Sequence, residues 1–249
     1  MDKVERLDKL LCSQGTLTRS EAGRLIRSGR VTVDGVPCRD PAKKWDPTGV
    51  TVAVDGKALG YAQYRYVMLN KPAGILCVSR DPKAPTVVDL LPPALQRRGL
   101  FPAGRLDKDT HGLVLITDDG AFAHALLSPR HHVPKTYRAV LDKPLDEEKI
   151  AAFCAGPTLE DGTQCQPAEL RVLQDGATPT VEVVIYEGRY HQIKRMFAAV
   201  GCHVTWLKRY AMGSLWLDAD LPEGACRELT EAEKISILNE NGCGKLSDI

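Results

Sequence analysis

The sequence lacks the long apolar run that a membrane-spanning helix requires, and its first residues lack the apolar core of a signal peptide. It also lacks the glycine-rich phosphate-binding loops and the HExxH pattern of common nucleotide and metal sites. The eight cysteines are scattered without a CxxC pair, which favours isolated thiols over a zinc site or a disulfide framework. We therefore expect a cytoplasmic protein that needs no membrane, metal or cofactor.

The composition is that of a globular protein, with 43% hydrophobic and 26% charged residues among 249. The net charge of +1 is unevenly distributed. Residues 1–44 contain ten Lys or Arg against six acids, residues 189–209 contain five against none, and residues 211–249 contain three against eight. Two basic zones indicate a polyanion partner, although any single charge run is more often a solvated face.

The first 60 residues predict a small module of two helices and two hairpins. Apolar spacing indicates a helix in Val4–Cys12, and Thr18 or Ser20 can cap a second helix. Asp34-Gly35 and Asp55-Gly56 supply the positive φ angles that tight hairpin turns require. The predicted strands are residues 31–33, 36–38, 50–54 and 57–59.

This module resembles the RNA-binding module first recognised in ribosomal protein S-four. The matching segments are Arg6–Leu11, Thr18–Ala22, Leu25–Ile26 and Gly29–Gly35. Guanidinium groups spaced on a rigid helical scaffold can pair with successive phosphates and give affinity with little sequence reading. The residues expected to bind RNA are Arg6, Lys9, Arg19, Arg24, Arg27 and Arg30.

After a linker at Tyr61–Tyr66, residues 61–240 predict a larger domain, followed by a tail at 241–249. Strands and helices do not alternate evenly, so we expect an α+β fold with a mostly antiparallel mixed sheet flanked by helices. Asn70–Gly74 is expected to turn the chain. The predicted strands are 66–69, 113–117, 136–141 and 181–186, and the predicted helices are 121–127, 147–155 and 190–200.

The stretch from Gly104 to Gly120 contains four acids. Asp118 or Asp119 precedes a predicted helix and suits an N-cap, so we expect both to be structural. Asp109 fits a solvated turn. Asp107 lies between Arg105-Leu106 and the same turn, and local pattern alone does not rank it above Asp109.

Two further segments carry reactive side chains. Ile193, together with Met196 and Phe197, forms a core stripe on a predicted helix, while His191 and Lys194 share another face with Arg195. A partly covered lysine there could keep a carboxylate ionised, and a plain basic surface is about as favoured by periodicity alone. In Lys135-Thr136-Tyr137, the tyrosine could belong to the core or stack on a base.

Taken together, these segments resemble the pseudouridine synthases, specifically the RsuA-like branch that carries an S-four-type module. The matching residues are Gly104–Gly120, Lys135–Tyr137, Gln192–Lys194 and Asn70–Gly74. The resemblance implies that Asp107 is the catalytic nucleophile, that Tyr137 stacks on a flipped uracil and that Lys194 pairs with Asp107. Ile193 would line the pocket, and Arg105 and His191 would contact the substrate.

The resemblance implies isomerisation of uridine to pseudouridine in ribosomal RNA without a cofactor, by a protein expected to be a monomer. The string Tyr190–Phe197 is most similar to the branch acting on 16S rRNA, and both free RNA and a partly assembled small subunit stay open as the substrate. Three alternatives stay open: a 23S rRNA target, a non-catalytic RNA-binding or ribosome-assembly factor, and a metal-dependent nuclease. The nuclease would use Asp107, Asp109, Asp118 and Asp119, and these acids are not expected to converge.

Overall fold

The computed structural model describes residues 4–128 and 131–240, and the predicted tail at 241–249 lies outside them. The chain forms two compact units. The first comprises Met1–Arg65 and Leu91–Leu100, and the second comprises Tyr66–Leu90 and Phe101–Ile249. No helix in the described residues is long and apolar enough to cross a membrane.

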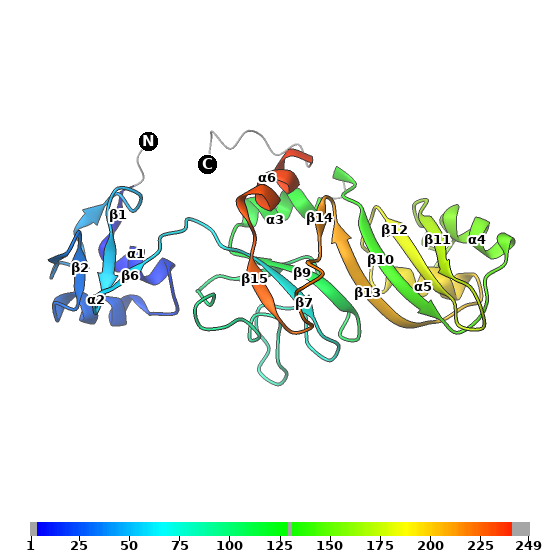
Figure 1. The fold of residues 1–249 in the computed structure, drawn as a ribbon, viewed down its shortest axis with the longest axis horizontal. Coiled ribbons are helices and arrows are strands. Elements are labelled where there is room, and N and C mark those ends of the chain that lie inside the picture. The colour runs from blue at the N-terminus through cyan, green and yellow to red at the C-terminus, as the bar shows by residue number, and fades with distance from the viewer. Residues whose placement is uncertain (1–3, 129–130, 241–249) are drawn as a thin grey trace. The chain divides into compact units, whose positions relative to one another are not determined.

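The N-terminal unit pairs two short helices with short antiparallel strands (Figure 1). Strands β3-β2-β5-β6 form one sheet in that order, and β1 pairs with β4. Its elements are β1 (Glu5–Arg6), α1 (Leu7–Ser13), α2 (Arg19–Arg27), β2 (Val31–Val33), β3 (Val36–Pro37), β4 (Lys44–Trp45), β5 (Val52–Val54) and β6 (Lys57–Leu59).

Local sequence signals explain the start of α2 and both hairpins. Thr18 is the N-cap of α2: its hydroxyl accepts a hydrogen bond from the Glu21 N–H (3.2 Å), and the Glu21 carboxylate accepts one from the Thr18 N–H (2.7 Å). Asp34 and Gly35 have φ angles of 50° and 78°, and the Asp55-Gly56 turn repeats this geometry at 50° and 77°. The predicted turns are therefore confirmed.

The helical prediction for Val4 is wrong. The first helix begins at Leu7, and Val4 is 54% exposed. Glu5 and Arg6 instead form β1, which pairs with Lys44 and Trp45 of β4. Long-range pairing of the backbone overrides the helical spacing there, and the core of the unit begins with Leu7 and Leu10.

The segment after β6 is held against the N-terminal unit. The Gln14 side-chain amide exchanges two hydrogen bonds with the backbone of Ala62, at 3.0 and 3.2 Å. The buried Arg97 guanidinium donates to the carbonyl oxygens of Ala62 and Gln63, both at 2.9 Å. This is why Leu91–Leu100 groups with residues that are distant in sequence.

The second unit is a mixed, mostly antiparallel sheet with helices, as predicted. Within the described residues the strand order is β11-β12-β10-β13-β9-β7-β15, with β8 beside β9 and β14 beside β13. The pairing of β9 with β13 is parallel. The elements are β7 (Tyr66–Lys71), β8 (Phe101–Ala103), β9 (His111–Thr117), α3 (Gly120–Leu127), β10 (Lys135–Leu141), α4 (Glu147–Cys154), β11 (Glu169–Gln174), β12 (Thr180–Ile185), α5 (Gln192–Ala199), β13 (Val204–Met212), β14 (Leu215–Trp216), β15 (Cys226–Glu228) and α6 (Glu231–Glu240).

Helix α3 begins where the sequence predicts. Asp119 is its N-cap and accepts a hydrogen bond from the Phe122 N–H at 3.0 Å, and it also accepts one from the Tyr66 hydroxyl at 2.7 Å. Tyr66 and Phe122 pack edge to face, with ring centroids 4.9 Å apart. The cap is thereby joined to the core between α3 and the sheet, which supports the structural assignment of Asp119.

Two predicted boundaries are wrong in the second unit. Asn70 and Lys71 do not turn the chain but extend β7, where they pair with Leu113 and Gly112 of β9. Helix α5 begins at Gln192 rather than at residue 190, because His191 adopts a left-handed conformation with φ of 49°. The spacing of apolar residues along a helix does not show that the residue before the helix adopts a left-handed conformation.

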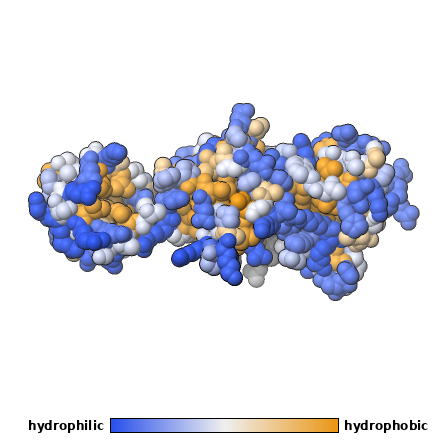
Figure 2. Space-filling model, turned by 90° about the horizontal axis from the view of Figure 1, so that it is seen from below, coloured by the Kyte–Doolittle hydropathy of each residue, from blue (hydrophilic) through white to orange (hydrophobic). Residues whose placement is uncertain are grey.

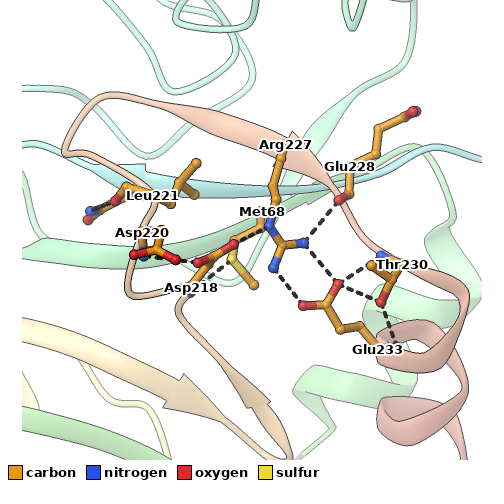
Figure 3. A network of polar contacts seen from close by, with 9 residues as sticks. Met68, Asp218, Asp220, Leu221, Arg227, Glu228, Thr230 and Glu233 are labelled. Atoms are coloured by element: carbon orange, nitrogen blue, oxygen red, sulfur yellow. Dashed lines mark hydrogen bonds and ion pairs between the residues drawn. The ribbon is translucent and has the colours of Figure 1, made fainter.

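Helix α6 is attached to β15 by a network around Arg227, drawn in Figure 3. The guanidinium bonds to Glu233 through both terminal nitrogens, at 2.7 and 2.9 Å, and to Asp218 through Nε at 2.7 Å. Glu233 also accepts from the Thr230 N–H at 2.7 Å. On the face shown in Figure 2, the apolar patches are bordered by hydrophilic side chains, and none of them extends unbroken across a unit.

Candidate active site

The buried side chain of Lys71 holds the backbone of the loop between β8 and β9. Lys71 is 0% exposed, and its ammonium lies 2.9–3.1 Å from four backbone carbonyl oxygens. Three of these acceptors belong to the loop, and burial lowers the pKa of the lysine. The acceptors are the carbonyls of Pro72, Asp107, Lys108 and Thr110. These contacts hold the loop backbone at Asp107 and over the residues that follow it.

Gly112 lets the loop join β9 directly beside β13. Its φ is +101°, and a Cβ atom there would lie 2.2 Å from the Arg209 carbonyl oxygen. Only glycine permits this approach of the two backbones, at the parallel pairing of Gly112 with Arg209. Any larger residue would separate the two strands where the sheet carries the loop.

Lys194 lies between two carboxylates of this loop. Its Nζ is 3.1 Å from Asp107 Oδ2 and 2.6 Å from Asp109 Oδ1. His191 Nε2 lies 3.5 Å from Asp107 Oδ1 on the other side. The predicted pairing of Lys194 with Asp107 is therefore present. Asp109 is an exposed turn residue, as the sequence suggests, but it also pairs with Lys194, which the sequence does not predict.

The charges of this cluster reinforce one another. Partial burial lowers the pKa of Lys194, but hydrogen bonds to Asp109 and Asp107 outweigh it, so the pKa is raised overall. The hydrogen bond from Lys194 lowers the pKa of Asp109. The lysine therefore stays charged at neutral pH and presents a permanent positive charge to Asp107, whose side chain is 23% exposed.

A cavity of about 750 Å³ contains all six residues predicted for the active site. They come from three separate segments: the loop before β9, strand β10, and the first turn of α5 with the residue before it. They are Arg105, Asp107, Tyr137, His191, Ile193 and Lys194. The tertiary fold thus unites residues that no local pattern connects.

The aromatic and apolar members form walls of this cavity. Tyr137 is 7% exposed and Ile193 is 3% exposed. Arg105 is exposed at the cavity and has no hydrogen-bond or ion-pair partner among the described residues. Arg195 is predicted to lie on the same helix face as Lys194. It does not pair with the acids of the β8–β9 loop but forms an ion pair with Asp161 at 2.5 Å.

Sequence reasoning missed two buried cations near this cavity. Lys71 belongs to a recognised motif, but no pattern predicts its contacts with four carbonyls. Arg209 lines the cavity and is 2% exposed. Leu207, Arg209 and Ala211 occupy alternate, buried positions of β13. A charged residue among alternating apolar residues could have indicated a buried functional cation.

The N-terminal unit has a shallower cavity of about 500 Å³ on its basic face. Arg6, Arg19 and Arg27 line it. Buried Asp8 accepts hydrogen bonds from Arg6 at 2.8 and 3.1 Å and from Arg19 at 3.2 Å. The Arg6 hydrogen bond is the main cause of the lowering of the Asp8 pKa to about 2. Asp8, which the sequence reading passed over, thus orients two exposed guanidinium groups.

The other three predicted RNA-binding residues do not line this cavity. Lys9 pairs with Glu5 at 2.9 Å, and Arg30 donates through Nε to Asp55 at 2.7 Å. Arg24 is exposed on α2. Exposed pairs of this kind contribute at most about 1 kcal/mol, so both cations can exchange their acids for another anion.

In the described part of the chain, no three His, Cys, Asp or Glu side chains are arranged to hold a metal ion. Asp119 is committed to the cap of α3, while Asp107 and Asp109 share Lys194. The four acids considered for a nuclease therefore do not form a metal site.

Comparison with known families identifies both units. Residues 65–199 match the model of the RNA pseudouridylate synthase family, and residues 5–48 match that of the S4 domain. The chain belongs to the RNA pseudouridylate synthases. It is accordingly an RNA pseudouridine synthase, an isomerase, of the RsuA-like type with an N-terminal S4 domain.

The proteins similar to this pseudouridine synthase over nearly its full length include the following two relatives and one solved structure. "Ribosomal small subunit pseudouridine synthase A" of Escherichia coli (strain K12) is 47% identical, covering 94% of this chain and 100% of the relative. "Uncharacterized RNA pseudouridine synthase YtzG" of Bacillus subtilis (strain 168) is 44% identical, covering 94% and 98%. A crystal structure of a pseudouridylate synthase has a TM-score of 0.65 at 38% identity and covers 93% of this chain and 99% of its own.

Proposed function

We propose that this pseudouridine synthase isomerises one uridine of 16S rRNA, either in free RNA or in a partly assembled small subunit. The observation that carries the proposal is the Asp107–Lys194 ion pair in a cavity walled by Tyr137. The relative from Escherichia coli, named for the ribosomal small subunit, supports the choice of RNA. A ribosomal substrate would make the protein cytoplasmic.

In the proposed reaction Asp107 is the nucleophile. The C1′–N1 bond of uridine must break and a C1′–C5 bond must form, with loss of the C5 proton and protonation of N1. A carboxylate can add to the ring or assist departure of the base from the sugar, and both routes require an ionised acid. Lys194 holds that ionised form in place, and the partly covered cavity strengthens the attraction between them.

The target base must leave its stack to reach Asp107, at a cost of a few kcal/mol. We propose that Tyr137 offsets part of this cost by stacking on the uracil, which contributes on the order of 1–3 kcal/mol per base. Ile193 would pack against the ring, and His191 and Arg105 would contact the nucleotide at the cavity entrance.

Charge supports an RNA substrate for this cavity. Its lining includes six Lys or Arg against two acids, Asp107 and Glu187. The cations are Arg105, Lys108, Lys135, Arg189, Lys194 and Arg209. A phosphodiester chain entering the cavity would therefore be attracted over its whole approach.

For the N-terminal module, with proposed bounds 1–60 before a catalytic domain at 61–240, we propose two classes of RNA contact. Arg6, Arg19 and Arg27 would bind phosphates in the shallow cavity. Lys9, Arg24 and Arg30 would add attraction around it. Contacts of this kind fix position and give salt-dependent affinity.

The test is tritium release from rRNA labelled at uracil C5, without added metal, by the full-length protein and by Asp107→Asn. We expect the variant to lose at least about 10³-fold in rate, as for other residues that act directly on the substrate. Asp109→Asn is the matched control, because it removes a carboxylate from the same loop and the same lysine. Release that survives Asp107→Asn, or that requires magnesium in the chemical step, contradicts the mechanism.

Mapping the modified nucleotide then identifies the target. Modification in 16S rRNA supports the proposal, and modification in 23S rRNA contradicts the choice of subunit. Binding without tritium release from either RNA, in free form or in assembly intermediates, would indicate a non-catalytic factor.

A further inference from the structure

Arg209 is a buried cation with an unused donor beside the cavity. Its Nε donates to the Leu113 carbonyl oxygen at 2.8 Å, and the side chain is 2% exposed. Its NH2 group is buried and has no hydrogen-bond acceptor within residues 4–128 and 131–240. A buried donor without an acceptor costs about 1–3 kcal/mol, so a bound group that supplies one would recover this cost.

A second cation, Lys135, lines the same cavity. Its ammonium donates to the Val133 carbonyl oxygen at 2.8 Å and has no ion-pair partner within the described residues. Burial, and next the charge of Arg209, lower the pKa of Lys135 to about 8, while the charge of Glu187 acts in the opposite direction. Arg209 disfavours the charged form of Lys135 beside the cavity, and Lys135 has no ion pair within the described residues, so the site favours an electron-rich ligand.

The position of these cations relative to Tyr137 suggests which ligand atom they meet. Arg209 is the register partner of Tyr137 on the neighbouring strand, and Lys135 precedes Tyr137 by two residues on its own strand. Partners across a sheet have Cβ atoms about 4.5–5.5 Å apart, and alternate residues share a face. A ring stacked on Tyr137 would therefore present its edge to the two cations.

We propose that Arg209 and Lys135 bind a carbonyl oxygen of the target uracil and stabilise the negative charge that the ring acquires during isomerisation. This inference rests on the proposed function, since it requires a uridine in the cavity. When the C1′–N1 bond breaks, its electron pair stays on the ring and is shared with O2 and O4. Addition of a carboxylate at C6 likewise places negative charge on O4, so the contact serves either route.

A contact at O4, rather than at O2, would also select uracil over cytosine. Guanidinium and ammonium groups donate hydrogen bonds and accept none. They match the O4 oxygen of uracil and oppose the amino group that cytosine carries at the equivalent position. An amino group facing Arg209 would leave its buried donor without an acceptor, which is a strong basis for discrimination.

The experiment combines an atomic change in the RNA with a change in the protein. Single-turnover rates are measured on RNA whose target position, mapped as above, carries uridine, 2-thiouridine or 4-thiouridine, because sulfur is a weak hydrogen-bond acceptor. We expect wild type to slow on at least one thio-substrate. Arg209→Met should slow uridine turnover by about 10²-fold, with little further loss on that thio-substrate. Lys135→Met should show the same non-additivity.

Lys208→Met is the matched control, since Lys208 precedes Arg209 on β13 and alternation places it on the opposite face of the sheet. The loss of rate caused by Lys208→Met and the loss caused by sulfur in the substrate should multiply, because the two changes are independent. The inference is overturned if the rate losses of Arg209→Met and Lys135→Met also multiply with the rate losses caused by sulfur, both at position 2 and at position 4 of the uracil.

One measurement on the wild type and one further variant keep the test decisive if Arg209→Met or Lys135→Met fails to fold. A wild-type enzyme indifferent to sulfur at both carbonyls would by itself overturn the inference, and Arg209→Lys provides a variant that keeps the charge. Absence of product from wild type on uridine RNA would contradict the proposed function instead.

Discussion

Lys194 and Asp109 form the shorter of the two ion pairs that join α5 to the β8–β9 loop, at 2.6 Å against 3.1 Å for Lys194 and Asp107. Asp109 is nevertheless 73% exposed, whereas Asp107 is 23% exposed. Water screens the Lys194–Asp109 pair more strongly, so its shorter distance does not make it the stronger ion pair. Asp107 lines the cavity and Asp109 does not, so the proposed nucleophile is the less exposed of the two acids.

Asp109→Asn should therefore lower the single-turnover rate by less than about fivefold, because exposed ion pairs contribute about 0–1 kcal/mol. Lys194 keeps its partner Asp107 in this variant. The measurement is tritium release beside Asp107→Asn. A loss as large as that of Asp107→Asn would show that the two acids act as one unit.

Lys71→Met should destabilise the second unit by roughly 3 kcal/mol or more, since each buried carbonyl left without a donor costs about 1–3 kcal/mol. The loop that carries Asp107 would also lose its support, so activity should fall in the protein that remains folded. Urea unfolding measures the free energy. Lys108→Met, an exposed lysine of the same loop, is the control, and equal stability of the two variants would contradict the role given to Lys71.

Arg27→Gln should lower RNA affinity and reduce the slope of log K against log salt by about one, as expected for loss of one phosphate contact. Arg24→Gln changes an exposed arginine on the same helix, outside the shallow cavity, and should reduce the slope clearly less. Filter binding over a salt series provides both slopes. Indistinguishable slopes would show that the cavity is not the main phosphate site.

The rate of the chemical step should decline as pH rises through about 8, where Lys135 loses its proton. The charged groups that act on it are Arg209 from β13, which favours deprotonation, and Glu187 after β12, which opposes it. Lys135→Arg keeps its charge at all accessible pH values. Its profile should stay flat to higher pH, and an alkaline decline identical to that of wild type would assign the titration to another group.

Glu233→Gln should destabilise the protein at neutral pH by roughly 1–3 kcal/mol, through loss of its charged hydrogen bonds with Arg227. The Arg227 hydrogen bond is the largest influence that lowers the Glu233 pKa from 4.5 to about 2. Because the folded pKa lies below the ordinary one, this stabilisation is present above about pH 4.5 and is lost as pH falls towards 2. Chemical unfolding of both proteins between pH 2 and 7 should show the difference shrinking with acid, whereas a constant difference would exclude the linkage.

Local chemistry in the sequence determined the elements whose causes lie within a few residues. Thr18 and Glu21 specify the start of α2 because they cap each other, and Asp34-Gly35 specifies its hairpin because both residues tolerate positive φ. Asp119 before an apolar run specifies the start of α3. The motifs were also long enough to imply the family from sequence, and the comparisons bear this out.

Tertiary structure alone decided the relations between distant segments. Val4 follows a helical spacing, yet pairing of β1 with β4 places the start of the helix after it. The sequence could not rank Asp107 above Asp109, nor foresee that both share Lys194, because no periodicity connects a loop with a helix 85 residues away. The contacts of Lys71 and Arg209 likewise exist only because the fold brings carbonyl groups of a distant loop to Lys71 and a carbonyl group of β9 to Arg209. Local propensity acts over a few residues, whereas burial and charge pairing depend on which segments the finished sheet brings together.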